Sequence, residues 1–213
     1  MAARGTRRRP ATDARALGRA RKHARILDAA ERLFALQGFA KTTIDEIAAA
    51  AQVSKGLVYD HYESKEALLD AVWARQVEGW TTATQSGVKV ARGARAEAIG
   101  EVLRVSVRHA RANPLLRRIL VQDPGALVGR GRAGVEAFAR HYRDLLEPVL
   151  ARGVETGELR ADLDVPGTAE LVWQVHFMLI RELFLGPQGG WRSDGDDLLD
   201  AAVALVVHGI RAR

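Results

Sequence analysis

The 213-residue chain contains no cysteine. This absence excludes disulfide bonds, thiolate metal sites and a cysteine nucleophile, and it fits a reducing cytoplasm. Long apolar runs are missing too: no stretch of about 18 apolar residues occurs, so we expect no membrane span. The early Arg7-Arg8-Arg9 run is not followed by an apolar stretch, which argues against a secretory signal.

Sequence motifs of common enzymes are also lacking. The chain has no G-x-S-x-G and no Walker A sequence, and its one G-x-G-x-x-G match, Gly129 to Gly134, lacks the preceding strand that a dinucleotide-binding motif requires. Its six histidines form neither H-x-x-x-H nor H-E-x-x-H, so a metal site would need ligands from distant parts of the chain. We therefore expect no enzymatic activity, no metal and no cofactor.

Positive charge is concentrated at the start of the chain. The net charge is +6, but the residues up to Arg25 hold nine basic side chains against the single acid Asp13, which leaves a negative remainder. Residues 1–17 show no apolar periodicity, so we expect a disordered basic tail there. Such tails commonly bind polyanions, above all nucleic acid. The alternative is a solvated leader with no partner.

The remaining chain predicts an all-α fold. Apolar residues recur at steps of three and four from about residue 18 onward, and no credible strand occurs. The helix that opens at residues 64–66 is expected to end near Thr82, and the Thr-, Ser- and Gly-rich stretch over 81–93 is expected to be a loop or a frayed helix end. We expect two parts, residues 18–68 and residues 69–213.

The most informative stretch runs from Thr42 to Lys65. Thr43-Ile44-Asp45-Glu46 has the form of a capping box, which predicts a helix beginning at Ile44. Ser54 is a second N-cap, followed by a short helix up to Tyr62. Two short helices joined by a tight turn are typical of the helix-turn-helix, whose second helix enters the major groove of DNA.

Over residues 26–72 the sequence resembles the DNA-binding domain of the TetR (tetracycline-repressor-like, TetR/AcrR) family of transcriptional regulators. The matching residues are Ile26-Leu27-Asp28-Ala29-Ala30, Leu33-Phe34, Gly38-Phe39, Thr42-Thr43, Ile47-Ala48, Val53-Ser54-Lys55-Gly56, Tyr59, His61 and Ser64-Lys65-Glu66-Ala67-Leu68. The sequence departs from the family at Gln52, where glycine is usual and a left-handed turn is expected, and at Tyr62, where phenylalanine is usual. Asp60 adds a negative charge to the second helix, where it faces either a cytosine or solvent.

The resemblance implies a DNA-binding domain over residues 18–68 and a helical ligand-binding and dimerisation domain over 69–213. It also implies which side chains contact DNA. Ser54 caps the recognition helix, and the residues nearest the base edges are Lys55, Gly56 and Leu57. The family positions that contact phosphates or the groove wall are Thr43, Tyr59, His61 and Lys65. The implied partners are double-stranded DNA with a palindromic operator and an unknown small-molecule inducer.

The residues 171–184 are almost continuously apolar but include His176 and Arg181. Because buried polar groups need partners, two hypotheses remain. In one, Trp173, His176, Phe177 and Arg181 line an inducer pocket for a partly polar or anionic ligand. In the other, neighbouring helices satisfy the polar groups or these lie at the rim of a dimer. Trp73, Trp80 and Tyr142 are expected in the core.

The last two helices are the most apolar, and in the family that this chain resembles such helices pair with their copies in a second subunit. We therefore expect a homodimer, with a monomer as the alternative. The predicted function is a cytoplasmic DNA-binding transcriptional regulator, a repressor released by its ligand. The competing hypothesis is a helical scaffold whose helix-turn-helix makes protein contacts.

Overall fold

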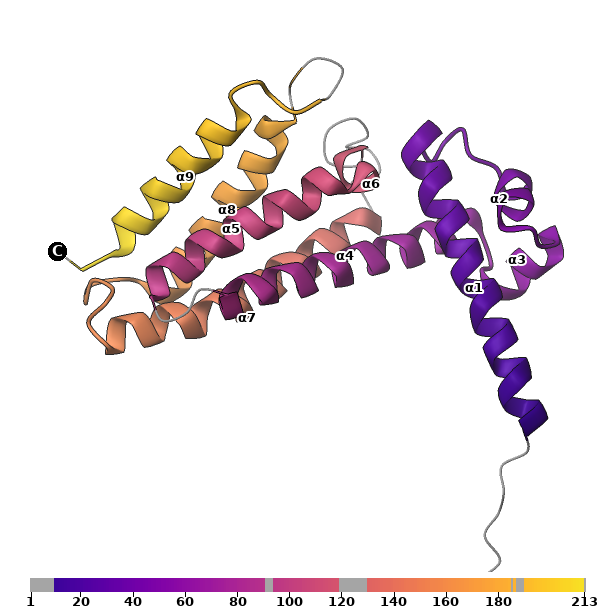
Figure 1. Cartoon of the computed structure of the whole chain (residues 1–213), viewed down its shortest axis with the longest axis horizontal. Helices are drawn as coiled ribbons and strands as arrows, with labels where there is room; N and C mark the ends of the chain where they lie inside the picture. Colours follow the sequence, from indigo (N-terminus) through magenta and orange to yellow (C-terminus); the bar gives the residue numbers. More distant parts are fainter. Residues whose placement is uncertain (1–9, 91–93, 119–129, 185, 187–189, 213) are drawn as a thin grey trace, which may run out of the picture. The chain divides into compact units, whose positions relative to one another are not determined.

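The computed structural model describes residues 10–90, 94–118, 130–184, 186 and 190–212. These residues form α-helices without a strand, apart from isolated bridges that join Leu159 to Arg211 and Gly186 to Gly190. The all-α prediction is confirmed. The helices are α1 (Pro10–Gln37), α2 (Ile44–Ala51), α3 (Lys55–His61), α4 (Lys65–Val90), α5 (Arg95–Ala112), α6 (Pro114–Arg117), α7 (Arg130–Glu155), α8 (Val165–Leu183) and α9 (Gly195–Ile210) (Figure 1).

The chain divides into two compact units, Met1–Val72 and Trp73–Arg213. The boundary that we predicted from the sequence lies between residues 68 and 69. Within the described residues, no helix combines the length and the apolar character needed to cross a bilayer.

The expectation of a disordered tail up to residue 17 is wrong from Pro10 onward, because α1 begins there. Residues 1–9 lie outside the described residues. The sequence from Pro10 to Leu17 lacks apolar periodicity, but it contains three alanines, one arginine and one leucine, which are good helix formers. Proline suits the first position of a helix because its missing N–H would have no partner there.

Helix α4 is longer than the sequence predicts. The Thr- and Ser-rich stretch that we expected to be a loop or a frayed helix end is helical as far as Val90. Its hydroxyl groups donate to carbonyls of the preceding turn: Thr82 Oγ1 to Glu78, Thr84 Oγ1 to Trp80 and Ser86 Oγ to Thr82, at 2.9–3.1 Å. Because these bonds stay within the helix, the hydroxyls do not compete with it.

The first unit is held by an apolar core between α1, α2 and α3. Its centre consists of fully buried side chains: Ile26, Ala30, Phe34, Ile47, Val58 and Leu68. The turn between α2 and α3 has the left-handed backbone expected at Gln52, with φ of 52°. Arg25 of α1 donates to both the carbonyl and the side-chain oxygen of Gln52, at 3.2 and 3.1 Å, which fixes this turn against α1.

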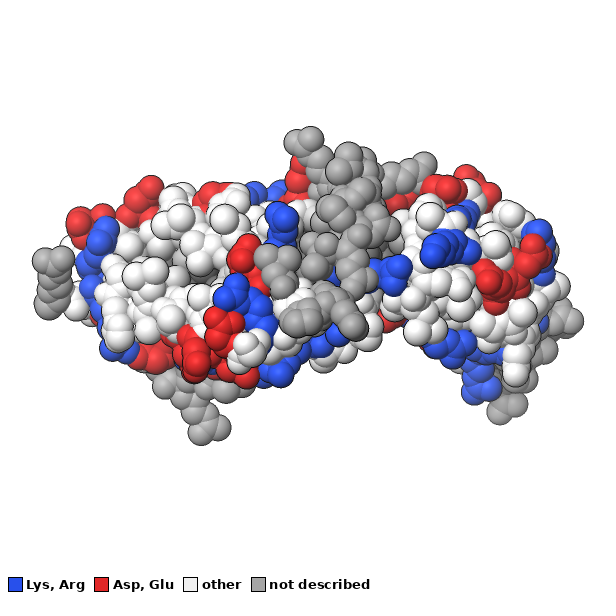
Figure 2. Space-filling model, turned by 90° about the horizontal axis from the view of Figure 1, so that it is seen from above, with Lys and Arg blue, Asp and Glu red and all other residues white. Residues whose placement is uncertain are grey.

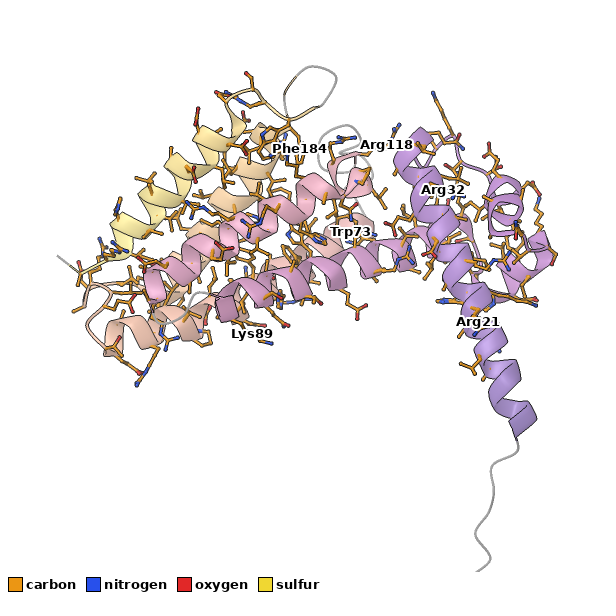
Figure 3. The ribbon with its side chains drawn as sticks, in the orientation of Figure 1. Arg21, Arg32, Trp73, Lys89, Arg118 and Phe184 are labelled. Atoms are coloured by element: carbon orange, nitrogen blue, oxygen red, sulfur yellow. The ribbon has the colours of Figure 1, made fainter. Side chains whose placement is uncertain are left out.

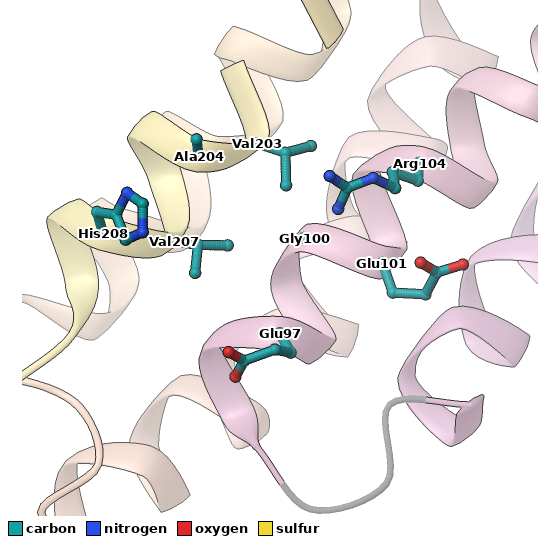
Figure 4. A pocket seen from close by; sticks show the side chains of 8 residues that line it. All are labelled: Glu97, Gly100, Glu101, Arg104, Val203, Ala204, Val207 and His208. Atoms are coloured by element: carbon teal, nitrogen blue, oxygen red, sulfur yellow. The ribbon is translucent and has the colours of Figure 1, made fainter. Parts of the chain in front are cut away.

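The second unit is a helical bundle in which α5 packs against α7 and α9, and α8 packs against α7 and α9. Buried side chains fill the space between these helices (Figure 3). Helix α9 approaches α5 closely at Gly100, where an added Cβ would lie 2.9 Å from Val203 Cγ1 and 3.0 Å from Val207 Cγ2 (Figure 4). A side chain at residue 100 would push the two helices apart.

Helix α9 has an inner and an outer face. Leu199, which the sequence places in one stripe with Ala202, is instead buried inside the subunit. The inner face consists of Leu199, Val203, Val207 and Ile210. Gly209 is exposed, with nothing within 4 Å of a Cβ placed there. Leu205 is 76% exposed.

Candidate nucleic-acid interface and ligand site

The predicted capping box at the start of α2 is present. The Thr43 N–H donates to Glu46 Oε2 at 2.8 Å, and the Glu46 N–H donates to Thr43 Oγ1 at 3.2 Å. The backbone hydrogen bond from Thr43 is the main reason that the pKa of Glu46 is lowered. Thr43 Oγ1 also donates to Glu46 Oε2 at 2.9 Å, so its proton already has an acceptor before any phosphate arrives.

Helix α3 presents the residues that we expected at the DNA. Ser54 caps the helix by accepting from the Leu57 N–H at 3.2 Å, and the buried Val58 anchors α3 to the unit. On the opposite side, Lys55, Gly56 and Tyr59 are exposed. Gly56 has nothing within 4 Å of a Cβ placed there, so space for close approach of a base edge is present. Leu57 and His61 are half-buried at the edges of this surface.

Lys55 forms an ion pair with Asp45 of α2. The Lys55 Nζ lies 2.9 Å from Asp45 Oδ2, and both side chains are more than half exposed. The hydrogen bond to Asp45 is the main cause of the raised pKa of Lys55. The ammonium therefore stays charged, and it is held at the surface where α2 and α3 meet.

Lys65 has a different environment from the one that phosphate contact would require. Its Nζ donates to the carbonyls of Phe39 and Thr42, at 2.9 Å each, and lies 4.4 Å from the centre of the Phe39 ring. The side chain is half-buried. Lys65 therefore fixes the turn between α1 and α2, and only its third N–H remains for a phosphate.

We expect Lys65→Ala to lower the free energy of unfolding by about 1–3 kcal/mol, because two carbonyls lose a charged donor. Lys41→Ala, in the same turn but exposed, is the matched control and should change stability by less than about 0.5 kcal/mol. Urea unfolding of both variants measures the difference. Equal stability of Lys65→Ala and wild type would contradict the structural role of Lys65.

His61 belongs to a small cluster that the sequence did not reveal. The His23 Nε2 and Tyr62 Oη atoms lie 2.7 Å apart, and the His23 and His61 rings are 5.4 Å apart. Burial is the first cause of the lowered pKa of His61, and the positive charges of His23 and Arg19 add to it. Tyr62, at the position where the family usually has phenylalanine, thus links α3 to α1. The exposed Asp60 lies beside Arg19 and Lys22 at the rim of a surface groove.

In the second unit, two of the predicted ligand-site residues lie in a group of buried rings from α4, α7 and α8, which we call the aromatic cluster. It consists of Trp80, Phe138, Tyr142, Trp173 and His176, none of which is more than 5% exposed. The Tyr142 and His176 rings stack at 4.9 Å, and the Trp80 and Phe138 rings at 4.3 Å. The sequence placed Trp80 and Tyr142 in the core, and they are buried as expected.

Arg181 does not join this cluster, because its side chain is exposed. Five residues separate it from His176, and five helical steps turn the chain by about 140° beyond one full turn. The two side chains therefore leave α8 on different sides. Phe177 is half-buried, with its ring 5.4 Å from that of Trp173 at the edge of the cluster.

In the described part of the chain, the potential metal ligands and a groove on the second unit add no further candidate functional residues. Among the residues that the structure describes, no group of three or more His, Cys, Asp and Glu side chains has the arrangement of a metal site. A groove between α5 and α9 is lined by Gly100, Val203 and Val207 and bordered by charged residues (Figure 4). Two of those border residues are in ion pairs, Arg104 with Asp200 at 2.9 Å and Glu101 with Arg108 at 2.6 Å.

Taken with the sequence motifs, a capped α2, a left-handed turn at Gln52 and a capped α3 with an exposed polar face define a helix-turn-helix DNA-binding domain. Residues 26–72 match the family model described as "Bacterial regulatory proteins, tetR family". This part of the chain is therefore similar to the DNA-binding domain of TetR-family transcriptional regulators.

Known proteins with similar sequences are regulators with a helix-turn-helix. The chain is 56% identical over 48 residues to the uncharacterized regulator YerO of Bacillus subtilis, a match that covers 22% of this chain and 17% of YerO. It is 28% identical over 149 residues to the transcriptional repressor KstR2 of Rhodococcus jostii, covering 70% of this chain and 72% of that protein. The higher of these two identities is therefore limited to a short segment of each chain.

Solved structures show that the fold is shared along most of the chain. The regulator FadR of Bacillus subtilis, solved with stearoyl-CoA, superposes with a TM-score of 0.73 at 19% identity, covering 89% of this chain and all of that one. AibR, solved with isovaleryl coenzyme A and operator DNA, has a TM-score of 0.63 at 24% identity, covering 87% and 97%.

Proposed function

We propose that this protein is a transcriptional repressor that binds a palindromic operator as a homodimer and is released by a small molecule. The observation that carries the proposal is the exposed polar face of α3, which is rigidly positioned by Val58 inside the first unit and by the Ser54 cap. A short, well-anchored helix can enter the major groove, where a glycine at its N-terminal end permits close approach and a lysine can donate to a base. Its role is binding, not catalysis, in the cytoplasm where bacterial DNA lies.

The proposed contacts divide into two kinds. Lys55, Gly56 and Leu57 lie at the N-terminal end of α3 and read base edges, and Tyr59, His61 and Thr43 face the phosphates. Lys65 has a mainly structural role, because two of its N–H groups already bind carbonyls. The basic residues of α1 that precede the core, including the exposed Arg21 (Figure 3), add charge near the same unit and strengthen non-specific binding.

A second subunit covers the outer face of α8 and α9 in this proposal. That face carries the exposed apolar side chains Leu171, Met178 and Leu205, which are 63%, 64% and 76% exposed. The upper side of the second unit shows a broad uncharged area with charged residues toward its edges (Figure 2). Exposed apolar side chains of this size are common at protein interfaces.

Response to a ligand is proposed for the second unit. FadR and AibR were solved with acyl-coenzyme A compounds, and their likeness supports a ligand-binding role for this bundle. In this chain the buried Trp173 and His176, with Phe177 at their edge, offer the site. A ligand that binds a conformation with a different spacing between the two α3 helices would release the operator.

Selection of bound sequences from a random pool of DNA duplexes tests the proposal. The purified protein should enrich two inverted half-sites, because a two-fold symmetric dimer reads a palindrome. A protein scaffold that uses its helix-turn-helix for protein contacts would enrich no sequence.

Lys55→Ala should relax the preference at one base position in each half-site by about ten-fold or more, because a lysine donor to guanine is lost. Asp45→Asn is the companion variant: it removes the ion-pair partner and keeps Lys55, so the base preference should persist. Selection with each variant measures both effects. An unchanged consensus and unchanged discrimination for Lys55→Ala would remove Lys55 from base reading.

A further inference from the structure

The aromatic cluster contains polar atoms that the described residues leave unpaired. Tyr142 Oη and both ring nitrogens of His176 are buried and have no hydrogen-bond partner there. His109 Nε2, in a ring stacked 6.4 Å from Trp80, is buried and unpaired as well. Buried polar side chains nearly always have partners, so this concentration at one place is informative.

Other polar side chains near the aromatic cluster have hydrogen-bond partners. The Trp80 indole N–H donates to Ser106 Oγ, and Thr84 Oγ1 donates to the carbonyls of Trp80 and Thr81 at 3.1 and 2.9 Å. His141 Nε2 lies 3.4 Å from the same Thr84 hydroxyl. Within this region the unpaired atoms therefore belong to the stacked pair of Tyr142 and His176 and to the neighbouring His109, whereas the buried, unpaired indole nitrogens of Trp73 and Trp191 lie outside the cluster.

We propose that the aromatic cluster binds an uncharged molecule that contains a ring and one hydroxyl or carbonyl group. The inference rests on the proposed function and specifies the chemical class of its ligand. A ring can stack on the π-faces that Tyr142 and Trp173 now offer to their neighbours. A hydroxyl or carbonyl gives the Tyr142 hydroxyl and a His176 nitrogen the partner that the protein does not supply.

The absence of a counter-charge excludes an ionic ligand. Burial lowers the pKa of His176 to about 3 and also lowers the pKa values of His109 and His141, so these imidazoles are neutral near pH 7. Three charged side chains of α7 and α8 are at least partly exposed: Arg143 pairs with Glu170 at 2.6 Å, and Asp144 is exposed. A carboxylate placed among the rings would lose its hydration with nothing to replace it.

The hypothesis drawn from the sequence, a pocket for a partly polar or anionic ligand, included Arg181 among the lining residues. That arginine is exposed and belongs to another side of α8. The Tyr142 hydroxyl and the His176 ring are uncharged hydrogen-bonding groups, so they favour a ligand that is polar but uncharged.

The test compares two probes of equal ring system, 2-naphthol and 2-naphthoate, at pH 7. Binding is followed by quenching of tryptophan fluorescence, because Trp80 and Trp173 belong to the cluster. We expect 2-naphthol to bind at least ten-fold more tightly than 2-naphthoate. Equal or tighter binding of the carboxylate, or binding of neither probe, would overturn the inference.

Two variants place the binding site. Tyr142→Phe removes one hydroxyl from the cluster and should weaken 2-naphthol binding by at least five-fold. Tyr62→Phe removes a hydroxyl from the first unit and should leave the binding of 2-naphthol unchanged. If both variants bind the probe like wild type, the assignment to the cluster is wrong. Enrichment of inverted half-sites by a protein that binds neither probe would reject this ligand class and leave the operator-binding function standing.

Discussion

Ala202→Arg is expected to convert the dimer into a monomer whose affinity for a palindromic operator is lower by about a hundred-fold or more. The two reading helices of a dimer are linked, so the second half-site binds at high effective concentration, and this gain amounts to roughly 10²–10⁴ in affinity. A monomer keeps only the contacts of one half-site. Sedimentation at several protein concentrations and titration of a labelled operator measure the two effects.

The structure explains why Ala202 is the position of choice. Ala202 is half-buried, and the exposed Leu205 and the half-buried Val206 follow it three and four residues later on α9. An arginine there would place a charge in the centre of an interface, where charged residues are depleted. The inner face of α9, which holds the subunit together through Val203 and Val207, is left intact.

Ala204→Arg is the matched control. Ala204 is exposed on the same helix but lines the groove toward α5, so the same substitution should leave the dimer unchanged. A double substitution of Ala202 and Gly209 by arginine that still sediments as a dimer would contradict the proposed interface.

His176 should make the second unit sensitive to acid. Burial lowers the pKa of His176 to about 3 in the folded protein, against about 6.5 in the unfolded chain. Above pH 6.5 the imidazole is neutral in both states, so its contribution is fully present there. As the pH falls below 6.5, the unfolded chain takes up a proton that the folded protein does not, and stability is lost until the pH reaches about 3.

The expected loss is about 1.4 kcal/mol for each pH unit, or about 3 kcal/mol between pH 6.5 and 4.5. His176→Phe should remove this share of the pH dependence, whereas the exposed His208→Phe should not. His109 and His141, whose pKa values burial also lowers, leave a smaller dependence behind. Urea unfolding at pH 7, 6, 5 and 4, at one protein concentration, measures the slopes. Equal slopes for wild type and His176→Phe would refute the buried neutral histidine.

Local signals in the sequence predicted the DNA-binding unit well. The Thr43–Glu46 capping box, the Ser54 cap and the left-handed Gln52 each depend on residues close together in the chain, and the structure confirms all three. The partners of Lys65 were not visible, because they are carbonyls more than 20 residues earlier. Only the packing of the turn between α1 and α2 brings them together.

The sequence predicted less where the structure depends on side-chain hydrogen bonds within a helix or on the direction in which side chains leave it. Helix α4 runs to Val90 because hydroxyl side chains bond within it, which composition alone does not reveal. The grouping of His176 with Arg181 was wrong for a reason that the sequence does contain, since helical spacing separates the two side chains. The aromatic cluster combines residues of α4, α7 and α8, and no local sequence pattern predicts contacts between helices that are far apart in the chain.

The most direct test of the account is the binding of the purified protein to three duplexes of equal length: the selected palindrome, one half-site of it and a scrambled sequence. At physiological salt we predict one dimer on the palindrome, with an affinity at least about 10³-fold above that for the scrambled duplex and the half-site in between. Equal affinity for all three duplexes would contradict sequence-specific operator binding, and with it the central claim.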